Sequence, residues 1–199
     1  VIDKGVQADF FTNAISGLVM DQQYFYRCYA SNATTQAWAP ATTNFTTLSI
    51  PTVNNSTGAS GITSNSAVLN GNLVSTGGAP TQVYVYWGPT DGGTNKSSWS
   101  NQVSMGILTT GLFSTNISGL ALASQYYYRC YATNSAGDAW APATSNFTTL
   151  ALPPAIDNSG GATNITADSA TLRGTLTSTG GVPTTVTIYY GLSDGGTNA

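Results

Sequence analysis

A long segment of this chain occurs twice. Residues 18–48 and 120–150 lie 102 positions apart, and 20 of their 31 aligned positions carry the same amino acid. Within the second copy, the period of a strand sends Tyr126, Tyr128 and Cys130 to one face and Arg129 to the other. Because the arginine marks the solvent side, the first face is expected to point into a core. The chain is therefore read as tandem β-rich repeats of about 102 residues.

The pattern around this strand is L-x-x-x-x-x-Y-x-Y-x-C-x-A-x-N, from Leu120 to Asn134. Through it the chain resembles fibronectin type III and related immunoglobulin-like modules, in the form of tandem repeats in large bacterial extracellular or surface proteins. The resemblance implies an all-β fold of tandem β-sandwiches. It also implies a tyrosine corner, in which the phenol of Tyr126 bonds to upstream backbone. A scaffold of this kind does not specify a function.

The repeat divides the chain into three parts. Residues 51–150 make one complete β-sandwich repeat. Residues 1–48 match the second half of a repeat and should form strands E–G, whereas residues 154–199 match the first half and should form strands A–C. Short, proline-containing linkers between the parts are expected to hold neighbouring sandwiches end to end.

Half a sandwich leaves its apolar face and strand edges open to water. We therefore expect residues 154–199 to fold with residues 1–48 of a neighbouring segment, head to tail, in a polymer or in a longer chain. In such a junction Val186, Ile188 and Tyr190 would pack on Tyr24, Tyr26 and Cys28 of the neighbouring segment. The complete repeat supplies the pattern for this contact, because Val83, Val85 and Trp87 are expected to pack there on Tyr126, Tyr128 and Cys130. Gly71 is expected to leave room for Trp87.

Composition limits the functions that the chain can have. Five Lys and Arg residues against eight Asp give a net charge of −3, which is unlike the basic surface that nucleic acids require. The chain has no His and no Glu, so a His-based triad, a Glu acid and a His-containing metal site are all excluded; we expect no enzyme and no cofactor. No apolar run approaches the roughly 20 residues of a membrane span. A weakly charged β-repeat is typical of extracellular or cell-surface proteins.

A glycine-rich loop follows the third predicted strand of the repeat. Asp91-Gly92-Gly93-Thr94-Asn95 returns as residues 194–198. Oxygen ligands from Asp91 and Asn95 on such a turn would suit calcium. The alternative is a tight turn, for which Asp-Gly supplies a positive φ. One carboxylate per loop favours the turn.

The two cysteines, Cys28 and Cys130, occupy the same position in successive repeats. Equivalent atoms of successive sandwiches lie roughly 30–40 Å apart, whereas a disulfide needs Cα atoms within about 7 Å. We expect both thiols to be buried and unpaired, with an inter-chain disulfide as the alternative.

Eight N-x-S/T sequons occur, of which only Asn44 and Asn146 form a copied pair. Each stands in N-F-T-T, where the Phe should point inward and the Asn outward. These two asparagines are the candidate glycosylation sites; the alternative is that hydroxyl-rich strands produce sequons without modification.

Several aromatic residues are expected on the outer face of the sheet that contains the repeated strand. Strands C and F are neighbours in this kind of sandwich. The predicted interaction face is Tyr84, Tyr86, Tyr127, Arg129 and Tyr131. Exposed tyrosine and arginine would suit contact with protein or stacking on sugars. The alternative is that tyrosine is a good strand former.

The function expected from these features is structural. The chain would be a tandem-repeat segment of an extracellular filament or surface rod, with copies of itself as head-to-tail partners. The alternative is an adhesin or carbohydrate-binding spacer module of a larger secreted protein, with glycans as partners.

Overall fold

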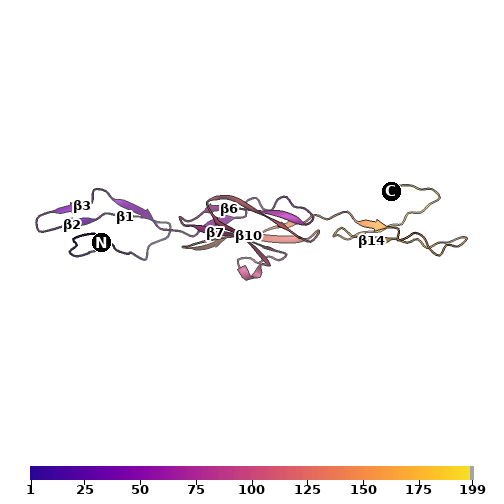
Figure 1. Ribbon diagram of the computed structural model, residues 1–199, viewed down its shortest axis with the longest axis horizontal. Coiled ribbons are helices and arrows are strands. Elements are labelled where there is room, and N and C mark those ends of the chain that lie inside the picture. Colours follow the sequence, from indigo (N-terminus) through magenta and orange to yellow (C-terminus); the bar gives the residue numbers. More distant parts are fainter. Residues whose placement is uncertain (198–199) are drawn as a thin grey trace.

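The computed structural model describes residues 1–197 and shows an elongated, all-β molecule. A complete β-sandwich lies in the middle, and the N-terminal and C-terminal segments extend from opposite ends of it (Figure 1). Among residues 1–197, no helix is long and apolar enough to cross a membrane.

Two antiparallel sheets form the central sandwich. One sheet has the order β5-β6-β9, and the other has the order β11-β10-β7-β8, with β12 also paired to β10. The strands are β5 (Thr52–Asn54), β6 (Ser66–Ser75), β7 (Thr81–Gly88), β8 (Asn101–Leu108), β9 (Gly111–Ser118), β10 (Gln125–Asn134), β11 (Gly137–Trp140) and β12 (Ser145–Thr148). A short 3-10 helix, η1 (Lys96–Ser98), lies in the loop between β7 and β8.

The core lies between the two sheets and follows the period of the strands. Side chains alternate between buried and less buried positions along β6, β7 and β10. Val83, Val85, Tyr128 and Cys130 have no exposed surface, and Cys130 lies directly opposite Val85. The inward face predicted for these residues is confirmed.

Gly71 makes room for an aromatic ring, but the ring is that of Phe113. A Cβ atom at Gly71 would overlap this ring and lie 2.8 Å from the Cys130 Sγ atom. Phe113 stands directly opposite Gly71 in the β6–β9 pairing. The expectation that Trp87 fills this space is wrong, because Trp87 packs instead against Tyr126, with ring centroids 6.3 Å apart.

The tyrosine corner is present in both copies. The backbone N–H of Ala121 donates to the Tyr126 hydroxyl at 3.0 Å, and the N–H of Val19 donates to the Tyr24 hydroxyl at 2.9 Å. The corner therefore also forms in the N-terminal segment, without the strands that surround it in the central sandwich.

The terminal segments contain fewer strands than their copies in the central sandwich. They form β1 (Gln23–Tyr26), β2 (Tyr29–Ser31), β3 (Gln36–Trp38), β4 (Thr43–Thr46), β13 (Ala155–Asp157) and β14 (Thr175–Ser178). The expected strand E within residues 1–48 and strand C within residues 154–199 are absent from the described residues. The reason is that β7, β8 and β9 each pair, within a sheet of the central sandwich, with a strand from the other half of the repeat. Their copies in the terminal segments have no such neighbour within this chain.

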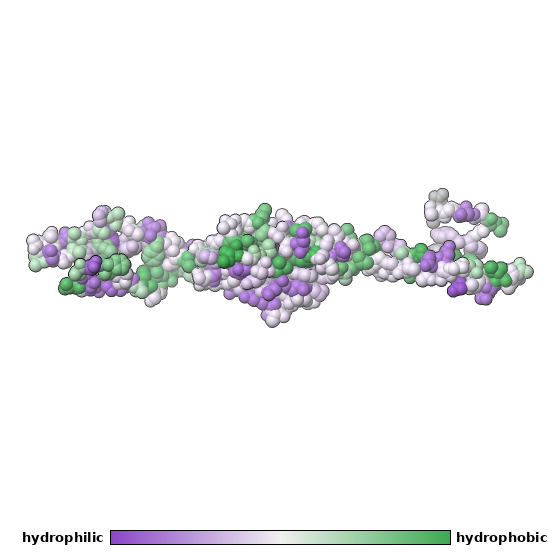
Figure 2. Space-filling view, in the orientation of Figure 1, coloured by the Kyte–Doolittle hydropathy of each residue, from purple (hydrophilic) through white to green (hydrophobic). Residues whose placement is uncertain are grey.

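The terminal segments also leave apolar side chains in solvent. Val186, Ile188 and Tyr190 are 47%, 53% and 88% exposed, whereas their counterparts Val83 and Val85 are buried. Figure 2 shows hydrophobic residues at the surface of both terminal segments. Residues 154–197 do not cover residues 1–48 of the same chain, since the two segments lie at opposite ends (Figure 1).

Candidate functional site

The outer face of the β7–β10 sheet carries the predicted aromatic cluster. Tyr84, Tyr86 and Tyr131 lie side by side, with ring centroids 6.0 to 6.2 Å apart. Trp140 on β11 joins them, with its ring 4.9 Å from that of Tyr131 and 5.0 Å from that of Tyr86. The structure thus brings the predicted residues together on one face.

This face is largely covered, contrary to expectation. The loop between β7 and β8 folds over it and places Trp99 against the tyrosines. Tyr131, Tyr86 and Trp99 are only 2%, 6% and 8% exposed. The prediction of an exposed Tyr/Arg patch is wrong for Tyr86 and Tyr131, while Tyr84 and Tyr127 are half-buried at its margin.

Lys96 fixes the covering loop to the sheet. Its Nζ donates to the Tyr131 hydroxyl at 2.6 Å and lies 3.9 Å from the centre of the same ring. This hydrogen bond raises the pKa of Lys96, and burial raises the pKa of Tyr86 beside it. The cluster therefore works as a second, smaller core that holds the loop down. Lys96 and Trp99 were missed by sequence reasoning; the signal was a tryptophan in an otherwise polar loop.

Arg129 is engaged with backbone rather than free for a ligand. Its Nε donates to the Ala141 carbonyl at 2.7 Å and its Nη2 donates to the Pro142 carbonyl at 2.9 Å. Arg27 makes the same two bonds to Ala39 and Pro40. Both arginines therefore satisfy carbonyl groups at the proline that interrupts the last strand of the repeat.

The glycine-rich loop after β7 forms a turn. The Asp91 carboxylate accepts hydrogen bonds from the Gly93 N–H at 2.8 Å and from the Thr144 hydroxyl at 2.9 Å. Asn95 caps η1, because its Oδ1 accepts from the Ser97 N–H. Residues 1–197 contain no cluster of three or more His, Cys, Asp or Glu side chains that could hold a metal. In the copied loop, Asn198 lies outside the described residues.

The two thiols differ. Both cysteines are free, but Cys130 is buried and Cys28 is exposed. Burial raises the pKa of Cys130 to about 12. The expectation that both are buried is therefore wrong for Cys28, because the segments that would cover it are absent from its half-sandwich.

The two candidate glycosylation sites are accessible. Asn44 on β4 and Asn146 on β12 are both exposed, while Phe147 beside Asn146 is buried.

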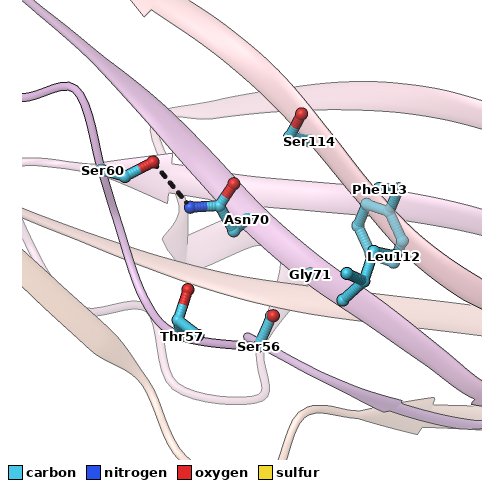
Figure 3. Close-up of a pocket in the computed structure, with 8 residues that line it drawn as sticks. All are labelled: Ser56, Thr57, Ser60, Asn70, Gly71, Leu112, Phe113 and Ser114. Atoms are coloured by element: carbon cyan, nitrogen blue, oxygen red, sulfur yellow. Dashed lines mark hydrogen bonds between the residues drawn. The ribbon is translucent and has the colours of Figure 1, made fainter.

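A shallow depression of about 440 Å³ lies beside β6 and β9 (Figure 3). Asn70 donates one amide hydrogen bond to the Ser60 hydroxyl at 2.9 Å and another to the Gly58 carbonyl at 2.8 Å. The amide donors at its centre are thus already used. It is lined by Ser56, Thr57, Ser60, Asn70, Gly71, Leu112, Phe113 and Ser114.

Comparison with known families found no matching family model, and no curated protein matches the sequence. Among the solved structures that resemble part of the chain are two of the sensor domain of the anti-sigma factor RsgI4 from Pseudobacteroides cellulosolvens. The shorter form is 18% identical with a TM-score of 0.38, and covers 52% of this chain and 98% of its own. The longer form is 19% identical with a TM-score of 0.34, and covers 52% of this chain and 93% of its own. No function follows from scores of this size.

Proposed function

We propose that the chain is a structural segment of an extracellular or cell-surface rod, built from tandem fibronectin III-like repeats whose neighbouring segments complete each other head to tail. One observation carries the proposal. The two terminal segments lie at opposite ends of the molecule, and each matches the part of the central sandwich that the other lacks.

The central sandwich supplies the template for the junction. Within it, Cys130 pairs with Val85, Ala132 with Val83 and Tyr128 with Trp87. If the equivalent residues of the two terminal segments pair in the same way, Cys28 lies opposite Ile188 of the neighbouring segment. Likewise, Ala30 lies opposite Val186 and Tyr26 lies opposite Tyr190. Each apolar side chain buried in this way contributes about 1.5–3 kcal/mol.

The fibronectin III-like form of the repeat is supported by two features. The strands are divided between two sheets in the way typical of such a sandwich, with the orders β5-β6-β9 and β11-β10-β7-β8. The consecutive strands β6 and β7 therefore lie in different sheets. The tyrosine corner between Tyr126 and Ala121 fits the same fold.

A structural role agrees with how the polar groups are used. Arg129, Asp91 and Asn95 bind backbone or neighbouring side chains of their own module. We assign no enzymatic activity, cofactor or nucleic-acid partner to the segment.

The alternative, an adhesin or carbohydrate-binding spacer, would use the depression in Figure 3, whose hydroxyl groups suit a neutral sugar. The repeat argues against it, because Arg173 occupies the position that corresponds to Asn70. A sugar site copied along a rod would be expected to keep the amide at this position.

The test is self-association of the chain. Sedimentation velocity and negative-stain microscopy should show end-to-end rods that lengthen with concentration. Ile188→Asp should abolish them, because the counterpart Val85 is fully buried. Thr185→Asp is the matched control, since its counterpart Gln82 is already polar and only half-buried. Monomers at all concentrations, or equal association of both variants, would contradict the junction.

A further inference from the structure

The linker that enters the central sandwich is held by a turn of that sandwich. The Ser49 N–H donates to the Gly77 carbonyl at 2.9 Å. The Asn134 side chain donates to the Ser49 carbonyl at 2.9 Å and to the Thr76 carbonyl at 2.7 Å. The linker residue Ser49 is thus bonded through both its backbone N–H and its backbone C=O.

Gly77 allows this contact by having no side chain. It is buried at a φ of +63°, and a Cβ atom there would overlap the Ser49 carbonyl oxygen. The next residue, Gly78, lies against Leu48, with 3.2 Å between its Cβ position and the Leu48 Cδ2 atom. Pro51, at the end of the linker, is fully buried.

The second linker repeats the arrangement. The Leu152 N–H donates to the Gly180 carbonyl at 2.8 Å. Gly180 is buried at a φ of +68°, and a Cβ atom there would overlap the Leu152 carbonyl oxygen. The Cβ position of Gly181 lies 2.7 Å from the Leu122 Cβ atom, which belongs to the preceding sandwich. The Gly-Gly turn therefore touches both the linker and the module before it.

We infer that the Gly-Gly turns at Gly77-Gly78 and Gly180-Gly181 are clamps that bind the incoming linker and fix the orientation of successive modules. A proline in each linker limits its freedom, but proline alone sets only one dihedral angle. The added hydrogen bond and the close backbone contact hold the joint at one angle. The stiffness of the rod then comes from these joints.

The role of the clamps in a rod rests on the function proposed above, but the joints themselves lie within one chain. They can therefore be tested in dilute solution, where chains are separate. Failure of head-to-tail association would leave the clamp intact, and failure of the clamp would leave the junction between half-sandwiches untouched. The experiments therefore distinguish failure of the clamps from failure of head-to-tail association.

The test is hydrogen exchange at the two linker amides of the full chain, followed by NMR. In the unaltered chain, the Ser49 and Leu152 amides should exchange at least 10-fold more slowly than unprotected amides. Gly77→Ala should remove the protection of Ser49 and leave that of Leu152 unchanged. Gly180→Ala should do the reverse, with the central sandwich intact because Gly180 lies outside it.

Gly93→Ala is the matched control. Gly93 has a φ of +59° but no atom within 4 Å of its Cβ position, so the substitution causes similar backbone strain without touching a linker. Small-angle scattering should show a shorter, broader distribution of interatomic distances for Gly77→Ala and Gly180→Ala only. The inference is overturned if the two amides are unprotected in the unaltered chain, or if the clamp variants match Gly93→Ala in both measurements.

Discussion

The side chain of Asn55 joins the two sheets of the central sandwich, since its Oδ1 accepts a hydrogen bond at 2.9 Å from the backbone N–H of Cys130, 75 positions along the chain. Its Nδ2 donates to the Ala143 carbonyl at 2.9 Å and to the Ser145 hydroxyl at 3.0 Å. These bonds lie at the interruption between β11 and β12, which contains Pro142. The sandwich is therefore held by a buried amide as well as by its apolar core.

Replacing this amide should be costly. Asn55→Ala leaves the buried Cys130 N–H without a partner, and an unsatisfied buried group costs about 1–3 kcal/mol. We expect the free energy of unfolding of the central sandwich to fall by about 2–3 kcal/mol, measured by urea denaturation. Asn72→Ala, on the outer face of β6, is the control and should change it by less than about 0.5 kcal/mol. Equal effects of the two substitutions would refute the role of Asn55.

The tyrosine corner makes a smaller contribution. Tyr126→Phe removes the acceptor of the Ala121 N–H, and the sequence alone suggests a cost of about 1–3 kcal/mol. Because this bond lies at an exposed position, we expect about 1 kcal/mol, read from the denaturation midpoint. Tyr127→Phe removes an exposed bond to Gln125 and serves as the comparison. An unchanged midpoint for Tyr126→Phe would show that the corner does not stabilise the fold.

Stability should fall at alkaline pH. Burial raises the pKa of Cys130 from 9.0 to about 12 and is the main cause that raises the pKa of Tyr128 from 10.0 to about 12. The folded state thus favours the neutral forms, so their contribution is complete below about pH 9 and is lost as the pH rises from 9 towards 12.

The unfolding free energy should therefore decrease by on the order of 1–2 kcal/mol between pH 8 and pH 10.5. Cys130→Ala should make this decrease shallower near pH 9–10, because one of the two groups is gone. A denaturation midpoint that stays constant from pH 8 to pH 10.5 would contradict the burial of these groups.

The sequence predicts the core strand by strand where its partners are present. The alternation of side chains along a strand correctly places Val85, Tyr128 and Cys130 in the core, because both sheets of the sandwich are present around them. The same pattern fails for Cys28 and for residues 186–190. A strand needs a hydrogen-bonding neighbour as well as a suitable sequence, and no neighbour covers these residues within the chain.

The outer aromatic face shows a different limit. The alternation of side chains correctly places Tyr131 and Cys130 on opposite faces of the sheet. It cannot show whether the outer face is exposed to solvent or covered by a loop. The loop that carries Lys96 and Trp99 lies 31 or more positions before Tyr131 in the sequence, and its polar composition gives no sign of where it folds. A tryptophan within a polar loop is the one signal that could have indicated a buried anchor.

If a neighbouring segment completes the half-sandwich around Cys28, the reactivity of this thiol should report it. The rate of labelling of Cys28 by a thiol reagent should be measured over a wide range of chain concentrations, with the buried Cys130 as internal reference. Cys28 should be labelled rapidly in dilute solution and protected at high concentration, and the protection should be absent in Ile188→Asp. Labelling of Cys28 at the same rate at every concentration would contradict the proposed completion.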